Sequence, residues 1–175
     1  DYKAESVRRC TGIVMQESFI FSDTICQNII LGEPFDKQHL DRAIAMACLT
    51  DYIDGLPLGI YTRIGTDGIG VSGGEKQRLM MARAIYKQPL YMMLDEATSS
   101  LDAENESKIT QNIGKEFQGR TLLVIAHRLS TVKNADNIIV LRDGKVVESG
   151  KHSELVELKG YYYELVKNQL ELADS

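Results

Sequence analysis

Two short stretches, about twenty residues apart, constrain the chain most: a glycine-rich turn that opens a helix, and an apolar strand that ends in two carboxylates. The turn is Ser72-Gly73-Gly74-Glu75, and the helix after it keeps apolar residues at helical spacing until Pro89. The strand is 91–94, which we expect to be buried on both faces, and Asp95 and Glu96 follow it directly. This order is typical of a phosphate-handling α/β site, so we predict an α/β fold.

The glycine-rich turn has the chemistry of an anion site. Gly73 and Gly74 lack side chains, which lets the backbone approach a bulky anion closely. The first N–H groups of a helix have no intrahelical partner, and together with the helix dipole they suit a phosphate. The same residues also fit a capping box, with Ser72 as N-cap and Glu75 reaching back to it, which needs no ligand.

The two carboxylates can serve different partners, because neighbouring strand residues project in opposite directions. One of Asp95 and Glu96 can hold Mg²⁺, directly or through water, while the other faces an attacking water. A helix N-terminus with acidic residues in its first turn is the plainer interpretation. It fits poorly, since apolar residues run straight into the pair.

These stretches resemble the signature and Walker B motifs of the ATP-binding cassette (ABC) ATPases, and three further motifs follow that family's order. Residues 99–102 look like its D-loop. His127, after the strand 121–126, looks like its switch histidine, and Gln16, after the strand-like run 12–15, looks like its Q-loop glutamine. Five motifs in the family's order make coincidence a poor explanation.

The resemblance implies ATP and Mg²⁺ as cofactors and assigns each motif residue a role. Glu96 would polarise the attacking water, Asp95 would support Mg²⁺, Gln16 would touch the metal site and His127 would contact the γ-phosphate. Residues of the signature motif would bind the γ-phosphate of a nucleotide held by a second subunit, with Asp102 also among the nucleotide-binding residues. The signature residues are Ser72, Gly73, Gly74 and Glu75, the last standing where the family more often has Gln.

A P-loop, which such ATPases need to cradle the nucleotide phosphates, is absent from these residues. Gly-Lys pairs occur at 114–115, 144–145 and 150–151, and none of them is followed by Ser or Thr, as a P-loop requires. In the family the P-loop precedes the Q-loop, and here fifteen residues precede Gln16. We therefore expect the chain to be the C-terminal portion of such a domain, and to be inactive apart from the rest of the parent protein.

The 175 residues are expected to form one truncated ABC ATPase domain. A helical subdomain would span about 23–88, and portions of the core sheet would lie in 1–22 and 89–175. Without the P-loop strand, which the family places mid-sheet, the edges of 91–94 and 121–126 would be unpaired or differently paired. Other expected elements are a strand over 8–15, helices over 36–49, 103–117, 153–158 and 161–172, and a hairpin of 136–141 with 145–148 around Asp143-Gly144, while 51–56 is expected to continue the helical subdomain.

Composition excludes several classes of protein. The net charge of −5 argues against a nucleic-acid partner, because proteins that bind nucleic acid usually carry a basic surface. The 43% hydrophobic content argues against disorder. The three cysteines show neither metal-type spacing nor the even count of a disulfide framework. No apolar run approaches the roughly 20 residues of a spanning helix, so membrane association would come through a partner or another part of the polypeptide.

The resemblance is to exporter-type ABC transporters in particular. The loop 62–68 resembles one typical of exporters, although Thr66 stands where that loop usually has Glu. The stretch 19–25 lies where an exporter domain receives the coupling helix of its transmembrane domain, and most resembles exporters of peptides or bacteriocins. Implied partners are the transmembrane domains and a second nucleotide-binding domain, at the cytoplasmic face of the cell membrane.

Two other functional classes share single motifs with the chain. ATPases of the SMC kind, in chromosome maintenance or DNA repair, share the signature motif, but the acidic balance and the loop 62–68 argue against them. A DEAD-box helicase is suggested by 95–98 but does not explain Ser72-Gly73-Gly74 upstream. The chain could also be a non-catalytic fragment.

Overall fold

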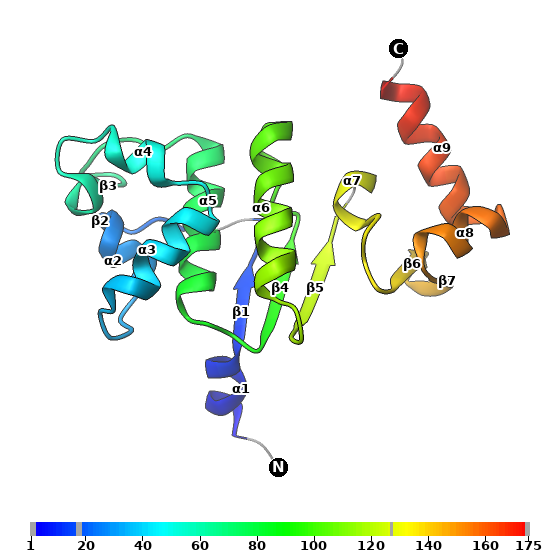
Figure 1. Ribbon diagram of the computed structural model, residues 1–175, viewed down its shortest axis with the longest axis horizontal. Coiled ribbons are helices and arrows are strands. Elements are labelled where there is room, and N and C mark those ends of the chain that lie inside the picture. The colour runs from blue at the N-terminus through cyan, green and yellow to red at the C-terminus, as the bar shows by residue number, and fades with distance from the viewer. Residues whose placement is uncertain (1–2, 17–18, 127, 174–175) are drawn as a thin grey trace. The chain divides into compact units, whose positions relative to one another are not determined.

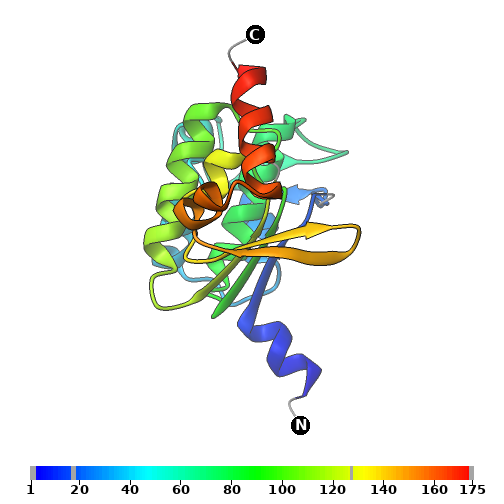
Figure 2. The ribbon, with the colours of Figure 1, turned by 90° about the vertical axis from the view of Figure 1, so that its right-hand side faces the viewer.

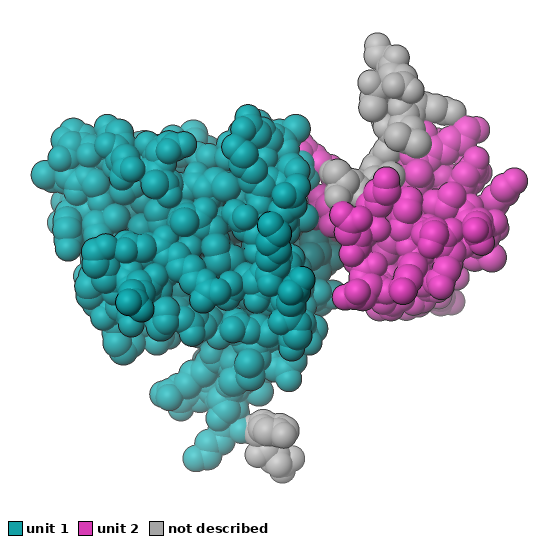
Figure 3. Space-filling view, viewed as in Figure 1, with its two compact units in different colours: residues 1–125 teal, residues 126–175 magenta. Residues whose placement is uncertain are grey.

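The computed structural model describes residues 3–16, 19–126 and 128–173, which form two compact units, residues 1–125 and 126–175 (Figures 1 and 3). The first unit combines a parallel sheet with helices, which confirms the predicted α/β class.

In chain order the elements of the first unit are α1 (Ala4–Cys10), β1 (Thr11–Val14), β2 (Asp23–Thr24), α2 (Ile25–Ile30), α3 (Lys37–Met46), α4 (Thr50–Asp54), a 3₁₀ turn (Gly59–Tyr61), β3 (Arg63–Ile64), α5 (Gly73–Tyr86), β4 (Tyr91–Asp95), α6 (Ala103–Glu116) and β5 (Thr121–Ile125).

The parallel sheet has the order β1-β4-β5. Its register places Val14 beside Leu94 and Asp95 beside Ile125, so the three carboxyl ends meet at one edge of the sheet. Helix α6 runs along one face of the sheet, as Figure 2 shows, and α5 contacts β1 (Figure 1). Polar residues that follow these strands are thereby collected at one edge, which is where α/β sheets bind ligands.

The predicted strand 8–15 is wrong in its first half, because residues 4–10 form α1. An i,i+4 ion pair between Arg9 and Glu5, 2.9 Å long, supports the helix, and Thr11 donates to the Val7 carbonyl at 2.8 Å. None of the α1 residues is buried. The strand begins only at Thr11, where alternate residues turn into the core.

The prediction that the strand 91–94 is buried on both faces is also wrong. Met92 and Leu94 are buried under the helices, but Tyr91 is 50% and Met93 40% exposed. The register continues this bare face onto both neighbouring strands, where Ile13 and Leu123 flank Met93 and are exposed as well. Among the described residues of the first unit, no element covers this side of the sheet.

The two strands were predicted to have edges that are unpaired or differently paired, and the structure shows one case of each. Strand β4 is central and paired on both sides, so its edges are not open. Strand β5 pairs with β4 alone among the described strands, which leaves its other edge without a backbone partner in that part of the chain. The sheet thus has an open edge beside a bare apolar face.

The helices between β2 and α5 bury the apolar faces that their periodicity predicts. Asp36 caps α3 by accepting from the His39 N–H at 2.9 Å, and Leu40 and Ile44 are buried. Helix α3 ends earlier than expected, at Met46, and Cys48 lies outside it with a φ of +53°. Helix α4, Thr50–Asp54, lies largely within the span 51–56 that we expect to continue the helical subdomain. All three cysteines are free thiols.

The second unit contains α7 (Leu129–Val132), β6 (Ile138–Arg142), β7 (Lys145–Gly150), α8 (His152–Leu158) and α9 (Tyr161–Ala173). Strands β6 and β7 form the predicted hairpin, with Asp143 and Gly144 both at positive φ as the tight turn requires. The core of the second unit is small and is formed by side chains of the hairpin and of the two helices that follow it. It consists of Ile138, Val140, Leu155, Tyr162 and Val166.

The bare face and open edge predict self-association of a polypeptide that contains only residues 1–175. An apolar sheet face beside an unpaired strand edge is a template for pairing with another copy. Light scattering should show oligomers, and substituting both Leu123 and Ile125 with Lys should shift them toward monomer. The control substitutes Ile139 and Val147, which are exposed on the hairpin, with Lys and should leave the oligomers unchanged. A monodisperse unsubstituted monomer would refute this.

Candidate functional site

Helix α5 begins with the capping box that the sequence predicts. The Ser72 hydroxyl accepts from the Glu75 N–H at 3.3 Å, and the Glu75 carboxylate accepts from the Ser72 N–H at 2.7 Å. This turns the Glu75 carboxylate back toward Ser72 and satisfies two of the orphan donors at this helix start. The N–H groups of Gly73 and Gly74 lie in the same first turn, where a helix supplies no partner.

The two glycines of the turn meet different surroundings. A Cβ at Gly73 would lie 3.6 Å from the Ser100 Cβ, which is ordinary contact, so a side chain would fit there. A Cβ at Gly74 would lie 3.3 Å from the Ser100 carbonyl, which is crowded. Gly74 therefore allows α5 to pack against the turn after β4, whereas Gly73 leaves the helix start open to a ligand.

Gln77 joins α5 to the turn after β4, and the sequence reasoning missed it. Its amide donates to the Ser99 hydroxyl at 3.0 Å and to the Glu96 carbonyl at 3.5 Å, and its carbonyl accepts from the Ser100 N–H at 2.9 Å. Gln77 stands one turn after Gly73, on the same helix face, and that spacing is the signal that could have revealed it. These bonds hold the signature and Walker B stretches together.

Glu96 adopts a left-handed backbone conformation, with a φ of +46°. A residue other than glycine in this region costs about 1–3 kcal/mol, and such strain is concentrated at functional sites. The Glu96 N–H donates to the Ile125 carbonyl at 3.0 Å, which extends the β4–β5 ladder past Asp95. Because the chain turns at Glu96, Asp95 and Glu96 have different backbone conformations at the end of β4. Both residues are partly exposed.

Asp102 caps α6, as the sequence also allows. One carboxylate oxygen accepts from the Asn105 N–H at 2.9 Å and the other from the Asn105 amide at 2.7 Å. The backbone hydrogen bond from Asn105 is the main cause that lowers the pKa of Asp102 below its ordinary value. Asp102 is therefore a carboxylate at neutral pH, and both of its oxygens are engaged in the cap.

The remaining predicted residues lie at the same sheet edge or outside the described residues. Gln16 is exposed and follows β1, whose end adjoins that of β4. The predicted switch histidine, His127, lies outside the described residues. Within the described ranges, no group of three or more His, Cys, Asp or Glu side chains could enclose a metal ion.

A Mg²⁺-bound nucleotide suits this donor set. Mg²⁺ usually keeps several waters and takes only one or two protein carboxylates together with substrate phosphates, and Asp95 is such a carboxylate at the end of a strand. The open helix start at Gly73 suits phosphate oxygens. The site as described lacks the cradle that a P-loop would add.

The loop 62–68, predicted to resemble one in exporters, is an ordered structure. Strand β3 within it pairs with β2, the Arg63 guanidinium donates to the Ser22 carbonyl at 3.1 Å, and the Thr66 N–H donates to the Ser22 hydroxyl at 3.1 Å. A Cβ at Gly68 would lie 2.4 Å from the Arg63 carbonyl, so only glycine fits. The loop is thus joined to the segment that precedes α2.

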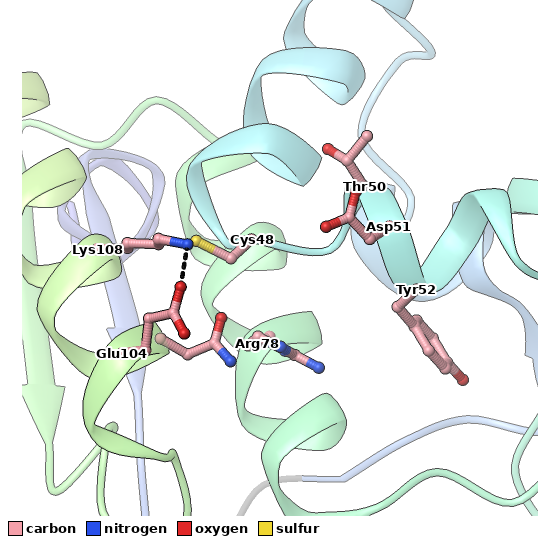
Figure 4. Close-up of a pocket in the computed structure, with 8 residues that line it drawn as sticks. Cys48, Thr50, Asp51, Tyr52, Arg78, Glu104 and Lys108 are labelled. Atoms are coloured by element: carbon pink, nitrogen blue, oxygen red, sulfur yellow. Dashed lines mark hydrogen bonds and ion pairs between the residues drawn. The ribbon is translucent and has the colours of Figure 1, made fainter.

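A pocket of about 560 Å³ lies between α4, α5 and α6 and includes none of the predicted site residues. Figure 4 shows Lys108 bonded to Glu104 (2.6 Å between Nζ and Oε1) on one side, with Asp51 and Arg78 also lining the pocket. Two acidic and two basic side chains balance one another, so the pocket offers no net positive charge to a triphosphate. We assign it no role in nucleotide binding.

Comparison with known proteins decides the family. The family model described as ABC transporter matches residues 1–99, more than half of the chain. The chain belongs to the ABC transporter family. A bacterial Atm1-family ABC exporter, solved with ATP bound, matches this ABC chain with a TM-score of 0.90 and 40% identity, over 95% of the present chain and 30% of the exporter chain.

Curated relatives of the ABC chain are full-length transport proteins. The ATP-dependent lipid A-core flippase of Cupriavidus metallidurans is 47% identical over 160 residues, which cover 89% of the chain and 27% of the flippase. P-glycoprotein 14 of Caenorhabditis elegans is 43% identical over 171 residues, 97% of the chain and 13% of that protein. The chain thus spans about a quarter or less of these relatives. Among the described residues, no helix is long and apolar enough to cross a membrane.

Proposed function

We propose that the parent protein is an exporter-type ABC transporter, and that this chain is the signature-bearing portion of its ATP-hydrolysing domain. The observation that carries the proposal is the connection made by Gln77, which holds the open helix start at Gly73 beside the Glu96 turn. A phosphate-binding helix start and a carboxylate pair are parts that phosphoryl transfer to water needs, and in a dimer the carboxylates would serve this domain's own nucleotide while the helix start would serve the partner's.

Glu96 would act as the general base and Asp95 as the metal carboxylate. Bound Mg²⁺ would neutralise the charge on the phosphates. The strained φ of Glu96 directs the chain away from β4 at this point, which separates the base from the metal-binding carboxylate. Gln16 and His127 would complete the site from the neighbouring strand ends, and Gln16 would also touch the metal.

The open helix start would face a nucleotide bound by a second nucleotide-binding domain. Ser72, Gly73 and Gly74 would contact its γ-phosphate, with Glu75 held back by the capping box. This arrangement avoids placing the Glu75 carboxylate against the phosphate, which Coulomb repulsion would oppose. Asp102 would support the same interface from the α6 cap.

The other proposed partners are the transmembrane domains of the parent protein, which would hold this domain at the cytoplasmic face of the membrane. The surface that would contact the transmembrane domains is formed by the loop 62–68 and the segment joined to it. Hydrogen bonds between these two stretches support this proposal. We retain the proposal that all 175 residues belong to one domain, with the helical subdomain over about 23–88. A peptide or bacteriocin as cargo stays a prediction, and so does the absence of a nucleic-acid partner.

Titration with Mg-ATP tests how much of the nucleotide-binding site lies within residues 1–175. The complete nucleotide-binding domain of the parent protein should bind Mg-ATP tightly, whereas residues 1–175 alone should bind it weakly, because most phosphate ligands would come from a P-loop outside them. Titration calorimetry on both samples measures the difference. Micromolar affinity for the isolated 175 residues would show that the site is complete without a P-loop.

A further inference from the structure

The turn that follows β4 starts at Glu96, whose left-handed backbone persists only if its surroundings hold it. Two backbone hydrogen bonds supply part of that hold. The Glu96 N–H donates to the Ile125 carbonyl of β5 at 3.0 Å, and the Glu96 carbonyl accepts from the Ser99 N–H at 3.1 Å. The first bond fixes Glu96 to the sheet. The second closes the turn, so it depends on where Ser99 is held.

Gln77 of α5 holds the far end of this turn with both atoms of its side-chain amide. The nitrogen donates to the Ser99 hydroxyl at 3.0 Å, and the oxygen accepts from the Ser100 N–H at 2.9 Å. The same nitrogen lies 3.5 Å from the Glu96 carbonyl, which is a weaker contact across the turn. Ser99 and Ser100 are exposed, so water can replace Gln77 as their partner. Loss of these bonds should therefore loosen the turn without unfolding the domain.

The middle of the turn is anchored independently of Gln77. Ala97 is buried in the core, as is Leu101 beyond the turn. The Thr98 hydroxyl donates to the carboxylate of Glu106 in α6 at 3.2 Å. These contacts keep the turn on the core when the Gln77 bonds are removed. What Gln77 adds is the placement of the residues that close the turn onto the Glu96 carbonyl.

Gln77 stands between two groups that serve different nucleotides in the proposed function. The helix start at Gly73, one turn before Gln77, serves the nucleotide of the partner subunit. Glu96 serves the nucleotide of its own subunit. The position of Gln77 in the sequence therefore associates it with the partner's nucleotide, whereas its hydrogen bonds associate it with its own subunit's nucleotide.

We propose that Gln77 is a positioning residue for Glu96 of its own subunit, although it belongs to the helix that faces the partner's nucleotide. The inference rests on the proposed function, in which Glu96 is the general base. The Gln77 amide holds Ser99 where it closes the turn, and the closed turn keeps the Glu96 carboxylate aligned with the attacking water. Without the amide the turn relaxes, and hydrolysis falls while nucleotide binding is kept.

The test asks in which subunit Gln77 acts. It uses the complete parent transporter assembled from two copies with different tags. One copy carries Glu96→Gln, so that only the nucleotide held by the other copy can be hydrolysed. Gln77→Met keeps the length of the side chain and removes its hydrogen bonds, and it is placed in one copy or the other. Rapid acid quench then measures the phosphate formed in a single turnover with Mg-ATP.

The proposal predicts a loss in one placement only. With Gln77→Met in the copy that retains Glu96, the rate should fall about 10²-fold, which is the cost that a misplacement of about 1 Å can have. With Gln77→Met in the copy that carries Glu96→Gln, the rate should stay unchanged, even though the helix start of that copy faces the working nucleotide. A loss only in this second placement would show that Gln77 acts through the helix start. Equal losses in both placements, or no loss in either, would also overturn the proposal.

Gln111→Met, placed in the copy that retains Glu96, is the matched control. Gln111 likewise donates to a serine hydroxyl, that of Ser107 at 3.3 Å, but it does so on the exposed surface of α6. The substitution is the same and removes the same kind of hydrogen bond. It should leave the rate unchanged, and a loss as large as that of Gln77→Met would overturn the proposal.

Two further measurements keep the test decisive. Titration calorimetry should give the same Mg-ATP affinity for both placements, because Gln77 acts on hydrolysis and not on binding. If Gln77→Met does not fold, Gln77→Ala removes the same bonds without adding volume, and it should give the same order of rates. Mixed dimers that form no phosphate with Gln77 in both copies would refute the proposed function itself, a result distinct from equal losses in the two placements.

Discussion

Glu96→Gln should lower ATP hydrolysis by the parent transporter about 10²–10⁴-fold, the usual contribution of a general acid–base group. Gln keeps the shape of the side chain and its backbone conformation, but it cannot accept the proton of the attacking water. Nucleotide binding should survive, and ATP-bound dimers of the nucleotide-binding domain should accumulate. Phosphate release under saturating Mg-ATP measures the first effect, and size-exclusion chromatography with light scattering measures the second.

Glu104→Gln is the control for this variant. Glu104 is an exposed residue of α6 whose carboxylate pairs with Lys108 at 2.6 Å. Exposed pairs of this kind contribute little to stability, so both hydrolysis and stability should stay close to those of the unsubstituted protein. Unchanged turnover in Glu96→Gln would exclude Glu96 as the catalytic base.

Gly73→Asp should abolish measurable hydrolysis while the fold is retained. A Cβ fits at Gly73, 3.6 Å from the Ser100 Cβ, so the domain can accept the side chain. The new carboxylate would stand at the helix start where we place the γ-phosphate, and two like charges in contact repel strongly in a site shielded from water. We expect a loss of at least about 10²-fold, comparable to removing a preorganised anion-stabilising group.

The matched control for this second variant is Gly114→Asp. Gly114 lies in α6 with no atom within 4 Å of an added Cβ, and the substitution adds the same charge. Hydrolysis should be kept and the melting temperature little changed, since Asp is a better helix residue than glycine. Hydrolysis by Gly73→Asp at the rate of the control would remove the helix start from the site.

Local sequence signals predicted those parts of the fold that depend on neighbours in the chain. Ser72 with Glu75 and Asp102 with Asn105 form the expected caps, because a cap requires only residues within one turn. The hairpin around Asp143-Gly144 formed for the same reason. These features carry their physical cause within a few residues.

Features that depend on distant partners were predicted less well. The apolar run 91–94 gave no sign that one face of its sheet would be bare, since the covering layer is set by elements remote in sequence. The pairing of β4 on both sides depends likewise on β1 and β5. Gln77 was overlooked because a lone amide on a helix has many uses, and only the folded turn at 96–100 reveals its three bonds.

Steady-state phosphate release from the purified parent transporter tests the central claim most directly, with residues 1–175 measured alone at the same molar concentration. The account predicts Mg-ATP hydrolysis by the transporter and none above background by the 175 residues, since these hold the signature and Walker B stretches without a P-loop. A transporter that releases no phosphate, or 175 residues that release it at the transporter's rate, would contradict it.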